Sequence, residues 1–463
     1  MSEQTGAPKP EDKLDFKRIL PIFIIVLVDL LGLTIIIPLL PLYATTFGAS
    51  PLVVGLLGAA YPIMQFLGAP LLGRLSDRYG RKPVLVVSQI GTLIGFLVLG
   101  FAGTLWMLFI SRIIDGISGA NIATAQAAIS DSTNEKTRTQ GLGLIGAAFG
   151  LGFIVGPVIA FISLEASGQN YHVPAFVAAA CSLLSILLTM FWFHETLPAG
   201  QRGEQAERAS FSFKSLITAV SHPAVGLLLV LMFAQQLAFG GFEQLLALFT
   251  LNRLGLNASG NAIVFVYVGI IVVAVQGGLI GRWSRRFGDR RLIYAGLALL
   301  AGGLLAIGLT ARQPPPWYSQ DEVRAELIAE QALPGETPPT EDIPVDLPDD
   351  SNNGWLGLAW LLVGMIPVAI GGGILQPAIN SLITKRVDVG DVGGMLGISA
   401  AFLSGANAVA PIIGGALFEA IGSSAPFVFW SLLMAALLVI AVRALRPGRE
   451  ESSPAGLARG GGH

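Results

Sequence analysis

The chain has 463 residues, of which 53% are hydrophobic and only 13% charged, with a formal net charge of −2 at pH 7. Soluble globular chains carry about 25% charged residues, and several apolar runs here exceed the ~20 residues that cross a bilayer core. A soluble globular protein is therefore excluded, and the charge balance gives no reason to expect a nucleic-acid partner. The single cysteine, Cys181, excludes an intramolecular disulfide, and we expect neither a metal nor a cofactor.

The first predicted element is a charged N-terminal arm, 1–18, followed by an apolar run that continues to about Tyr43. That run is too long for the core of a signal peptide, and no small-residue cleavage pattern follows it. We interpret it as a retained first membrane span.

Apolar runs separated by glycine, proline and charged residues predict an all-α polytopic membrane protein with twelve spans. The expected spans are 19–43, 52–73, 83–103, 105–130, 139–164, 173–194, 222–251, 261–281, 291–311, 355–384, 392–420 and 425–446. A polar linker, 195–221, divides them into two six-helix bundles, 19–194 and 222–446, and a polar tail follows at 447–463.

Basic residues fall almost entirely on one side of this predicted topology. Of the 28 lysines and arginines, all but four (Arg112, Arg253, Arg312 and Arg324) lie in the terminal segments or in loops on the same side as the N-terminus. Cytoplasmic loops carry the excess of basic residues in membrane proteins. We therefore expect both termini in the cytoplasm and the chain in the cell membrane.

The largest loop on the other side is an acidic, proline-rich insert, 312–354. Such a composition is not expected to bury itself. Three interpretations stay open: a solvated insert, a vestibule that attracts cations, and a partner-binding element.

An internal repeat relates the two bundles. The stretch GAPLLGRLSDRYGRKPVLV at 68–86 resembles QGGLIGRWSRRFGDRRLIY at 276–294. A second match, between Gly156-Pro157 and Ala410-Pro411, has a larger offset, and the difference is about the length of the acidic insert. One insertion thus reconciles both matches, which predicts pseudo-symmetric halves of the kind found in transporters.

The densest charge lies in GRLSDRYGRKP, residues 73–83, between the second and third spans. Gly73 is expected to close the second span and Gly80 to form a tight turn. The bases hold this loop on the cytoplasmic side, but they do not explain Asp77, which is the only acid among them.

At this stretch the chain resembles the major facilitator superfamily, whose cytoplasmic signature G-x-x-x-D-R-x-G-R-K is matched here. The matching residues that we assign to a conformational switch are Gly73, Asp77, Arg78, Gly80 and Arg81. The resemblance implies that Asp77 bonds to the eleventh span, near Val392, and stabilises the outward-facing state. A role only in topology is the alternative. The second copy carries Arg285 in place of the acid.

The fifth span resembles one group within this superfamily, the antiporters. Its residues Gly143, Gly152, Gly156 and Pro157 fit the antiporter pattern G-x8-G-x3-G-P of that superfamily, with Ala160 as a departure, and we add them to the predicted switch. Close helix packing through glycine is the alternative without a transport meaning. In the first span, Asp29, Gly32, Pro38 and Pro41 resemble the start of twelve-helix drug/proton antiporters.

Three charges are expected inside the first half-bundle: Asp29, Arg112 and Asp115. Asp29 lies ten residues into its span, or ~15 Å deep at 1.5 Å per residue. Charges at such depth are costly unless paired or hydrated, so they are functional candidates. Arg112 and Gly116 match the fourth-span signature R-x-x-x-G, which the resemblance links to proton coupling. The neighbouring Arg112 and Asp115 form either a static ion pair or a proton switch.

Glu243 is the corresponding acid of the second half, and it is expected to bind a cationic substrate, to carry a proton or to face an outer vestibule.

Uncharged polar residues within the spans either line a cavity or form hydrogen bonds between helices. The candidates for substrate binding are Gln65, Asn121, Gln126, Gln235 and Gln236.

These features predict a monomeric secondary transporter that exports drugs or other amphipathic small molecules in exchange for protons by alternating access. No Walker motif G-x-x-x-x-G-K-[ST] occurs in the sequence, which argues against ATP hydrolysis. The alternatives are a proton-coupled metabolite transporter of the same fold and, more remotely, a non-transporting receptor or scaffold. The sequence leaves the identity of the substrate open.

Overall fold

The computed structural model describes residues 15–119, 121–133, 137–198, 218–222, 225–329, 345–387 and 392–445. Residues 1–14 of the predicted N-terminal arm 1–18, residues 199–217 of the linker 195–221 and the whole predicted C-terminal tail lie outside these residues.

The first half contains the helices that precede the linker. They are α1 (Phe16–Ile36), α2 (Leu40–Thr46), α3 (Pro51–Tyr79), α4 (Arg81–Gly100), α5 (Leu105–Ser118), α6 (Asn121–Asp131), α7 (Arg138–Ser167) and α8 (His172–Phe191). The second half contains α10 (Gly226–Leu254), α11 (Ala258–Ala274), the π-helix η3 (Val275–Leu279), α12 (Ile280–Phe287), α13 (Asp289–Gly308), α14 (Gln320–Ala329), the 3-10 turn η4 (Asp350–Asn352), α15 (Leu356–Arg386), α16 (Val392–Ile421) and α17 (Ala425–Ala444).

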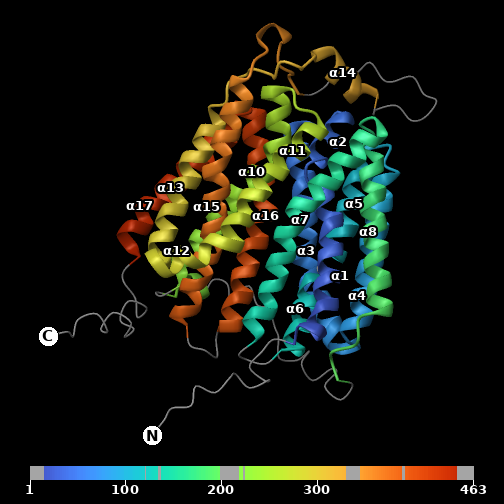
Figure 1. Ribbon diagram of the computed structural model, residues 1–463, viewed down its shortest axis with the longest axis vertical. Helices are drawn as coiled ribbons and strands as arrows, with labels where there is room; N and C mark the ends of the chain where they lie inside the picture. The colour runs from blue at the N-terminus through green and yellow to red at the C-terminus, as the bar shows by residue number, and fades with distance from the viewer. Residues whose placement is uncertain are drawn as a thin grey trace, which may run out of the picture.

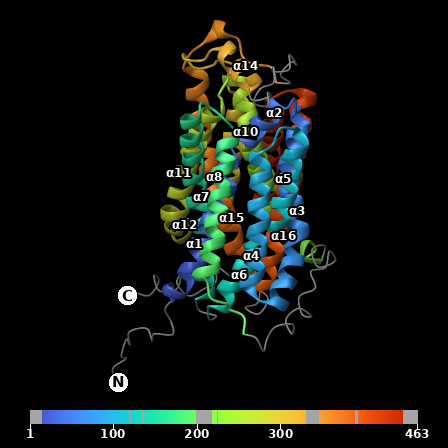
Figure 2. The same ribbon diagram turned by 90° about the vertical axis from the view of Figure 1, so that its right-hand side faces the viewer.

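Twelve helical segments in the described part of the chain are long and apolar enough to cross a membrane, which confirms the predicted count. The fourth span is formed by α5 and α6 together, and the eighth by α11, η3 and α12. Figures 1 and 2 show them as one elongated bundle. We call the end that carries α14 the insert face, and the end at which α1 begins and α17 ends the terminal face.

The two halves repeat one local structure at the terminal face. Gly80 ends α3 with φ = 108° and ψ = 161°, and Gly288 ends α12 with φ = 81° and ψ = 150°. These glycines occupy the same position of the internal repeat, and both adopt a positive φ that other residues rarely take. The second copy of the motif has therefore kept its turn although it has lost its acid.

One predicted boundary was wrong. Gly73 was expected to end the second span, but α3 continues to Tyr79, so most of the charged motif is helical. The reason is that Arg74, Asp77 and Arg78 lie at the membrane surface, where water solvates charge without interrupting the backbone hydrogen bonds of a helix.

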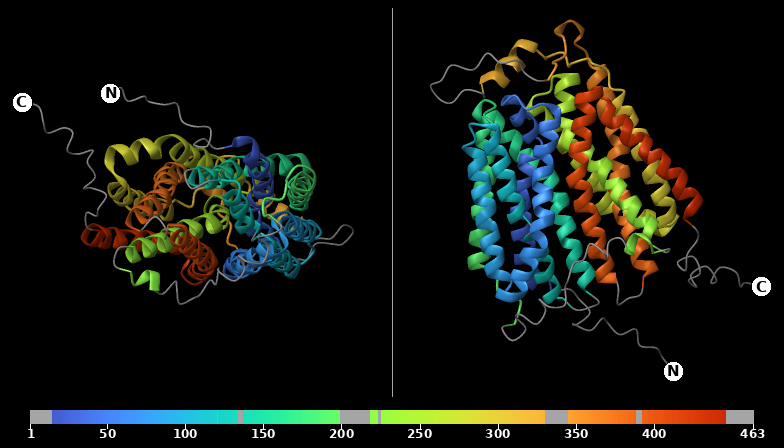
Figure 3. Two further views of the ribbon diagram at one scale, coloured as in Figure 1. Left: turned by 90° about the horizontal axis from the view of Figure 1, so that it is seen from below. Right: turned by 180° about the vertical axis from the view of Figure 1, so that it is seen from behind.

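Close contacts join the halves near the insert face. A Cβ on Gly55 of α3 would collide with the carbonyl oxygen of Pro411 of α16, and the Glu419 carboxylate accepts bonds from the Ser50 hydroxyl (2.6 Å) and the Leu52 amide (2.9 Å). Toward the terminal face, the helices of the second half tilt away from those of the first (Figure 3, right). The two halves are therefore in contact at the insert face.

The acidic insert is partly folded, contrary to expectation. It contains α14 and η4, and it buries Tyr318, Leu327, Val345 and Leu347. Most acids in the described part of the insert are exposed (Asp321, Glu322, Asp346, Asp349 and Asp350), and Glu326 is half-buried. Residues 330–344 lie outside the described residues.

Candidate transport site

A cavity of about 580 Å³ lies between the two halves, a size typical of small-molecule sites. Both halves contribute to its wall, which combines phenylalanines such as Phe149 and Phe239 with a set of amides. Gln65 and Gln126 line it from the first half, and Gln236 from the second. An apolar wall with a few fixed polar groups suits an amphipathic ligand.

Most of the predicted substrate-binding residues lie at this cavity. Gln65 is oriented by bonds from its amide nitrogen to the Tyr61 hydroxyl (3.1 Å) and the Gly119 carbonyl (3.0 Å). Gln236 donates to the Asn407 side chain at 2.8 Å, also at the wall, and Gln235 lies beside it with its Oε1 unpaired. These contacts hold the amides in place before any ligand arrives.

Glu243 also lines the cavity, from α10 of the second half. Within the described residues, no hydrogen bond or ion pair is assigned to its carboxylate. A carboxylate facing an apolar cavity without a protein partner favours a cationic or hydrogen-bonding group opposite it.

Asn121 occupies a different place from the one predicted. It is buried, and its amide nitrogen donates to Asp29 Oδ2 at 2.9 Å instead of lining the cavity. Asn121 is the first residue of α6, which with α5 forms the fourth span, and its side chain contacts α1. The other oxygen of Asp29 is buried and has no partner in the part of the chain that the structure describes.

Asp29 belongs to a buried charge cluster inside the first half. Asp115 lies close enough for its charge to act on Asp29, and it pairs with Arg112 at 3.1 Å. Both members of that pair have side chains that are at most 3% exposed, and Arg112 also reaches the cavity wall. The cluster thus joins an acid in the protein interior to the surface on which a substrate would lie.

Polar side chains of α4, which sequence reasoning missed, extend this cluster. Thr92 lies beside Asp115, and Gln89, one turn earlier, donates to the Ser185 hydroxyl of α8 at 2.8 Å. The buried Oε1 of Gln89 has no partner among the described residues. Buried polar atoms of this kind are commonly satisfied by ordered water, so the cluster can be hydrated. A period of three to four between Ser88, Gln89 and Thr92 was the available signal.

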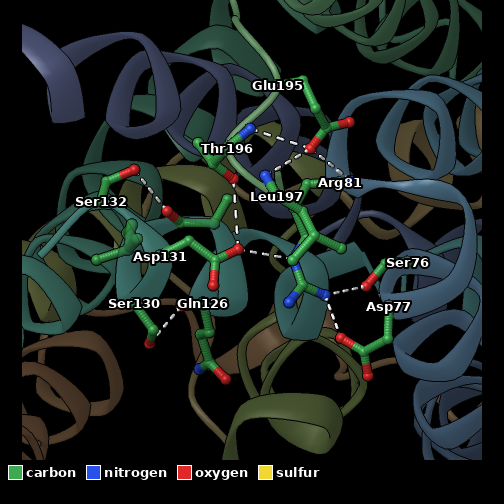
Figure 4. Close-up of polar contacts among 12 residues, drawn as sticks. Ser76, Asp77, Arg81, Gln126, Ser130, Asp131, Ser132, Glu195, Thr196 and Leu197 are labelled. Carbon is green, nitrogen blue, oxygen red and sulfur yellow. Dashed lines mark hydrogen bonds and ion pairs between the residues drawn. The ribbon is translucent and has the colours of Figure 1, made fainter. Parts of the chain in front are cut away.

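The conformational-switch motif forms an ion-pair network at the terminal face (Figure 4). Arg81, at the start of α4, bonds to Asp77 Oδ1 (2.6 Å) and Asp131 Oδ2 (2.9 Å). Glu195 accepts from the backbone amides of Arg81 (2.9 Å) and Lys82 (3.1 Å), which stabilises the start of that helix. The network ties together α3, α4, the end of α6 and the chain after α8.

Asp77 therefore bonds within its own half in this structure. Its expected contact near Val392 of α16 cannot be read here, because the side chain of Val392 lies outside the described residues. Arg78 lies beside Tyr79, with the guanidinium carbon 5.5 Å from the ring centroid. Gly73 has open space where a Cβ would be, so packing does not require a glycine there.

The second half carries the same network with its charges reversed. Asp289, at the start of α13, pairs with Lys385 of α15 at 2.6 Å and accepts from the Ser381 hydroxyl at 2.6 Å. In the internal repeat, Asp289 corresponds to Arg81 and Lys385 to Asp131. Each half thus joins its helices at the terminal face through an ion pair between these two repeat positions. The base and the acid have exchanged places between the two halves.

This correspondence predicts that the ion pair between Arg81 and Asp131 tolerates an exchange of its two charges. Arg81→Asp alone should destabilise the purified protein by about 3 kcal/mol, because it leaves acids without a base in a mostly buried site. Arg81→Asp combined with Asp131→Lys should recover most of that loss, as read from thermal unfolding in detergent. A double variant no more stable than the single one would contradict this account.

Two glycines of α7 pack closely against α1, which both interpretations of the glycine pattern predict. A Cβ on Gly156 would overlap with Thr34 of α1, and Gly152 lies against the same threonine. Pro157 lies inside the helix, where it removes a backbone donor. Gly143 lies in α7, but its surroundings are outside the described residues.

Comparison with known proteins places this geometry in a family. The family model described as Major Facilitator Superfamily matches residues 22–319. The chain belongs to the major facilitator superfamily. It is thus a multi-pass membrane transporter of small molecules, in a family of transporters and not of enzymes.

Its relatives include drug-resistance proteins. The chain is 34% identical over 276 residues to the tetracycline resistance protein, class B, of Escherichia coli, covering 59% of this chain and 68% of that protein. It is 28% identical to multidrug resistance protein 1 of Bacillus subtilis (strain 168), covering 91% of this chain and 95% of that one. The human organic anion transporter MFSD10 (TETRAN) superposes with a TM-score of 0.63 at 22% identity, covering 94% of this chain and 100% of that one.

Proposed function

We propose that this transporter exports drugs or other amphipathic small molecules in exchange for protons. The observation that carries the proposal is the position of the cavity. It lies between the halves, has an aromatic and amide wall, and touches Arg112, whose partner Asp115 lies beside Asp29. Relatives with drug resistance in their names support the substrate class.

In this proposal Asp29 carries the proton. Its carboxylate is held by Asn121 on one side, and its other oxygen has no partner among the described residues, so that oxygen can take up a proton. Arg112 neutralises Asp115 while the cavity is empty. A substrate that displaces Arg112 would change the charge felt by Asp29, which couples substrate binding to proton binding.

The proton gradient supplies enough free energy for such exchange. One proton entering the cell releases ~2.3 kcal/mol per 100 mV, and a pH difference of one unit adds ~1.4 kcal/mol. Because every ~1.4 kcal/mol is a tenfold ratio, a one-to-one exchange sustains a gradient of a few hundredfold for an uncharged substrate.

We further propose that the terminal face is cytoplasmic, since the loops at that face hold most of the basic residues. The structure is then closed to the outside, and Asp77 would reach α16 only after the terminal-face ends of the halves come together.

Asp77→Asn should slow transport without lowering expression, whereas Arg285→Gln, at the matching position of the second half, should leave the transport rate unchanged. Equal transport rates for the two variants would exclude this latch.

A drug-panel growth assay tests the function. Expression in a sensitive host should raise tolerance to tetracycline or to lipophilic cations such as ethidium, and an uncoupler should abolish the associated efflux. Nutrient-dependent uptake with no change in tolerance would favour the alternative, a metabolite transporter of the same fold. Deletion of 312–354 with flux retained would exclude the receptor or scaffold.

A further inference from the structure

The acidic insert is anchored to the second half at its base. Arg312 pairs with Asp346 at 2.8 Å, and Asn252 of α10 donates to the carbonyl of Asp346 at 2.8 Å. The Tyr318 ring packs on Gly255, where a Cβ would overlap with it, and its hydroxyl donates to the Pro348 carbonyl at 3.0 Å. The start and end of the insert therefore move with the second half.

Between these anchors, α14 crosses onto the first half. Figures 1 and 3 show it lying over the insert-face ends of first-half helices, and it packs against α2. Leu327 is only 2% exposed and belongs to the same apolar core as Tyr43 and Leu42 of α2, with Val323 packed against that core. An exposed insert would not bury a leucine so completely.

A polar contact at Glu326 joins both halves to α14. The Glu326 carboxylate accepts from the side-chain nitrogen of Asn257, which caps α11 of the second half, at 3.1 Å. Its other oxygen lies 3.5 Å from the hydroxyl of Tyr171, which precedes α8 of the first half. Beneath it, Gln169 and Ser259 bond across the same boundary at 2.8 Å.

We propose that α14 is a strap that holds the two halves together at the insert face and must release before that face opens. The proposal rests on the alternating access of the proposed function, but on neither its substrate nor its coupling ion. Docking of the strap biases the resting protein toward the insert-face-closed state, so that external solutes do not enter the cavity from that side.

The strap is expected to dock more strongly at low pH. Burial raises the pKa of Glu326, with the nearby charge of Glu165 on α7 adding to the rise and the bonds from Asn257 and Tyr171 opposing it. A released strap exposes Glu326 to water and restores the ordinary carboxyl pKa, so the docked strap binds the proton more tightly. Docking is therefore strongest at low pH and weakens as the pH rises through the raised pKa. Arg324, the nearest base on α14, is exposed.

Spin-label distances in full-length protein test the strap. In a Cys181→Ser background, labels at Ala325, on the exposed side of α14, and at Phe101, at the insert-face end of α4, report docking. We expect one narrow distance distribution, which Leu327→Asp broadens while the exposed Glu322→Gln leaves it unchanged. Retention of the narrow distribution in Leu327→Asp would overturn the proposal.

A second pair of labels, at Phe101 and at Ile421 at the end of α16, reports the opening of the halves. Loss of the Leu327 contact should raise the open population about tenfold or more. If Leu327→Asp does not fold, Leu327→Ser serves instead. Release of the strap with no change in this second distance would also overturn the proposal.

The pH response provides an independent test. Glu326→Gln, which mimics the protonated acid, should keep the strap docked and remove the dependence of docking on pH, whereas Glu322→Gln should retain it. An unchanged pH response in Glu326→Gln would refute the assigned role of Glu326. Because these measurements use no transported drug, their outcome is separate from that of the proposed function.

Discussion

Asp29→Asn should reduce proton-driven efflux in everted membrane vesicles to the level of vesicles that lack the protein. The substitution keeps the size of the side chain and an oxygen that accepts from Asn121, so the local structure should persist. It removes the titratable group, and without it the cycle cannot exchange a proton for a substrate. Tetracycline and ethidium are suitable probes, and uptake driven by respiration is the measurement.

Exchange assays separate this effect from a folding defect. Asp29→Asn should still exchange labelled substrate for unlabelled substrate at equal pH, because exchange requires no net proton release. Asp321→Asn, which removes an exposed acid from the insert, is the matched control and should transport normally. Uphill efflux that survives in Asp29→Asn at normal expression would contradict the assignment of Asp29.

Gly55→Val should abolish transport by preventing closure at the insert face. A valine at this position would drive its side chain into the Pro411 carbonyl of α16, and neither backbone can yield without separating the halves. Overpacking of this kind costs about 1–3 kcal/mol or more, which shifts a conformational equilibrium by about 5- to 150-fold. The distance between labels at Phe101 and Ile421 should lengthen as transport is lost.

A glycine elsewhere in the bundle controls for helix propensity. Gly302 of α13 is exposed and has no atom within 4 Å of a Cβ added to it, so Gly302→Val should leave both transport and the label distance unchanged. Normal transport by Gly55→Val would show that the close approach of α3 and α16 is not needed in the cycle.

The number of spans was predictable because the bilayer imposes it. Each span needs about 20 apolar residues, and all of its backbone hydrogen bonds must form within the span. The first requirement can be recognised directly from the residue types along the chain. The ends of the spans were less predictable. The α3 helix passes through its charged motif to Tyr79, and α15 ends at Arg386, because a helix that leaves the membrane has no reason to stop at a charge.

The candidate site was predictable by residue type but not by contact. Depth alone selected Asp29, Arg112 and Glu243, since charges inside a membrane are rare and costly. The bond between Asn121 and Asp29 joins two spans that are far apart in the sequence, and no local pattern marks such a contact. Uncharged residues such as Thr92 were missed because a single threonine can bond to its own helix.

The reversed ion pairs show a signal that was present in the sequence. Aligning the halves places Arg81 opposite Asp289 and Asp131 opposite Lys385, and the exchange of sign at both positions indicates a contact. The folded insert had no comparable signal, because only Leu327 and a few other apolar residues within an acidic stretch decide its packing.

Transport in proteoliposomes tests most directly whether protons drive export through this cavity. Purified protein is reconstituted with an acidic interior and an alkaline exterior, and ethidium or tetracycline is added outside. The account predicts accumulation inside the vesicles that nigericin collapses and that Asp29→Asn lacks. Accumulation that is equal with and without the pH gradient, or that persists in Asp29→Asn, would contradict it.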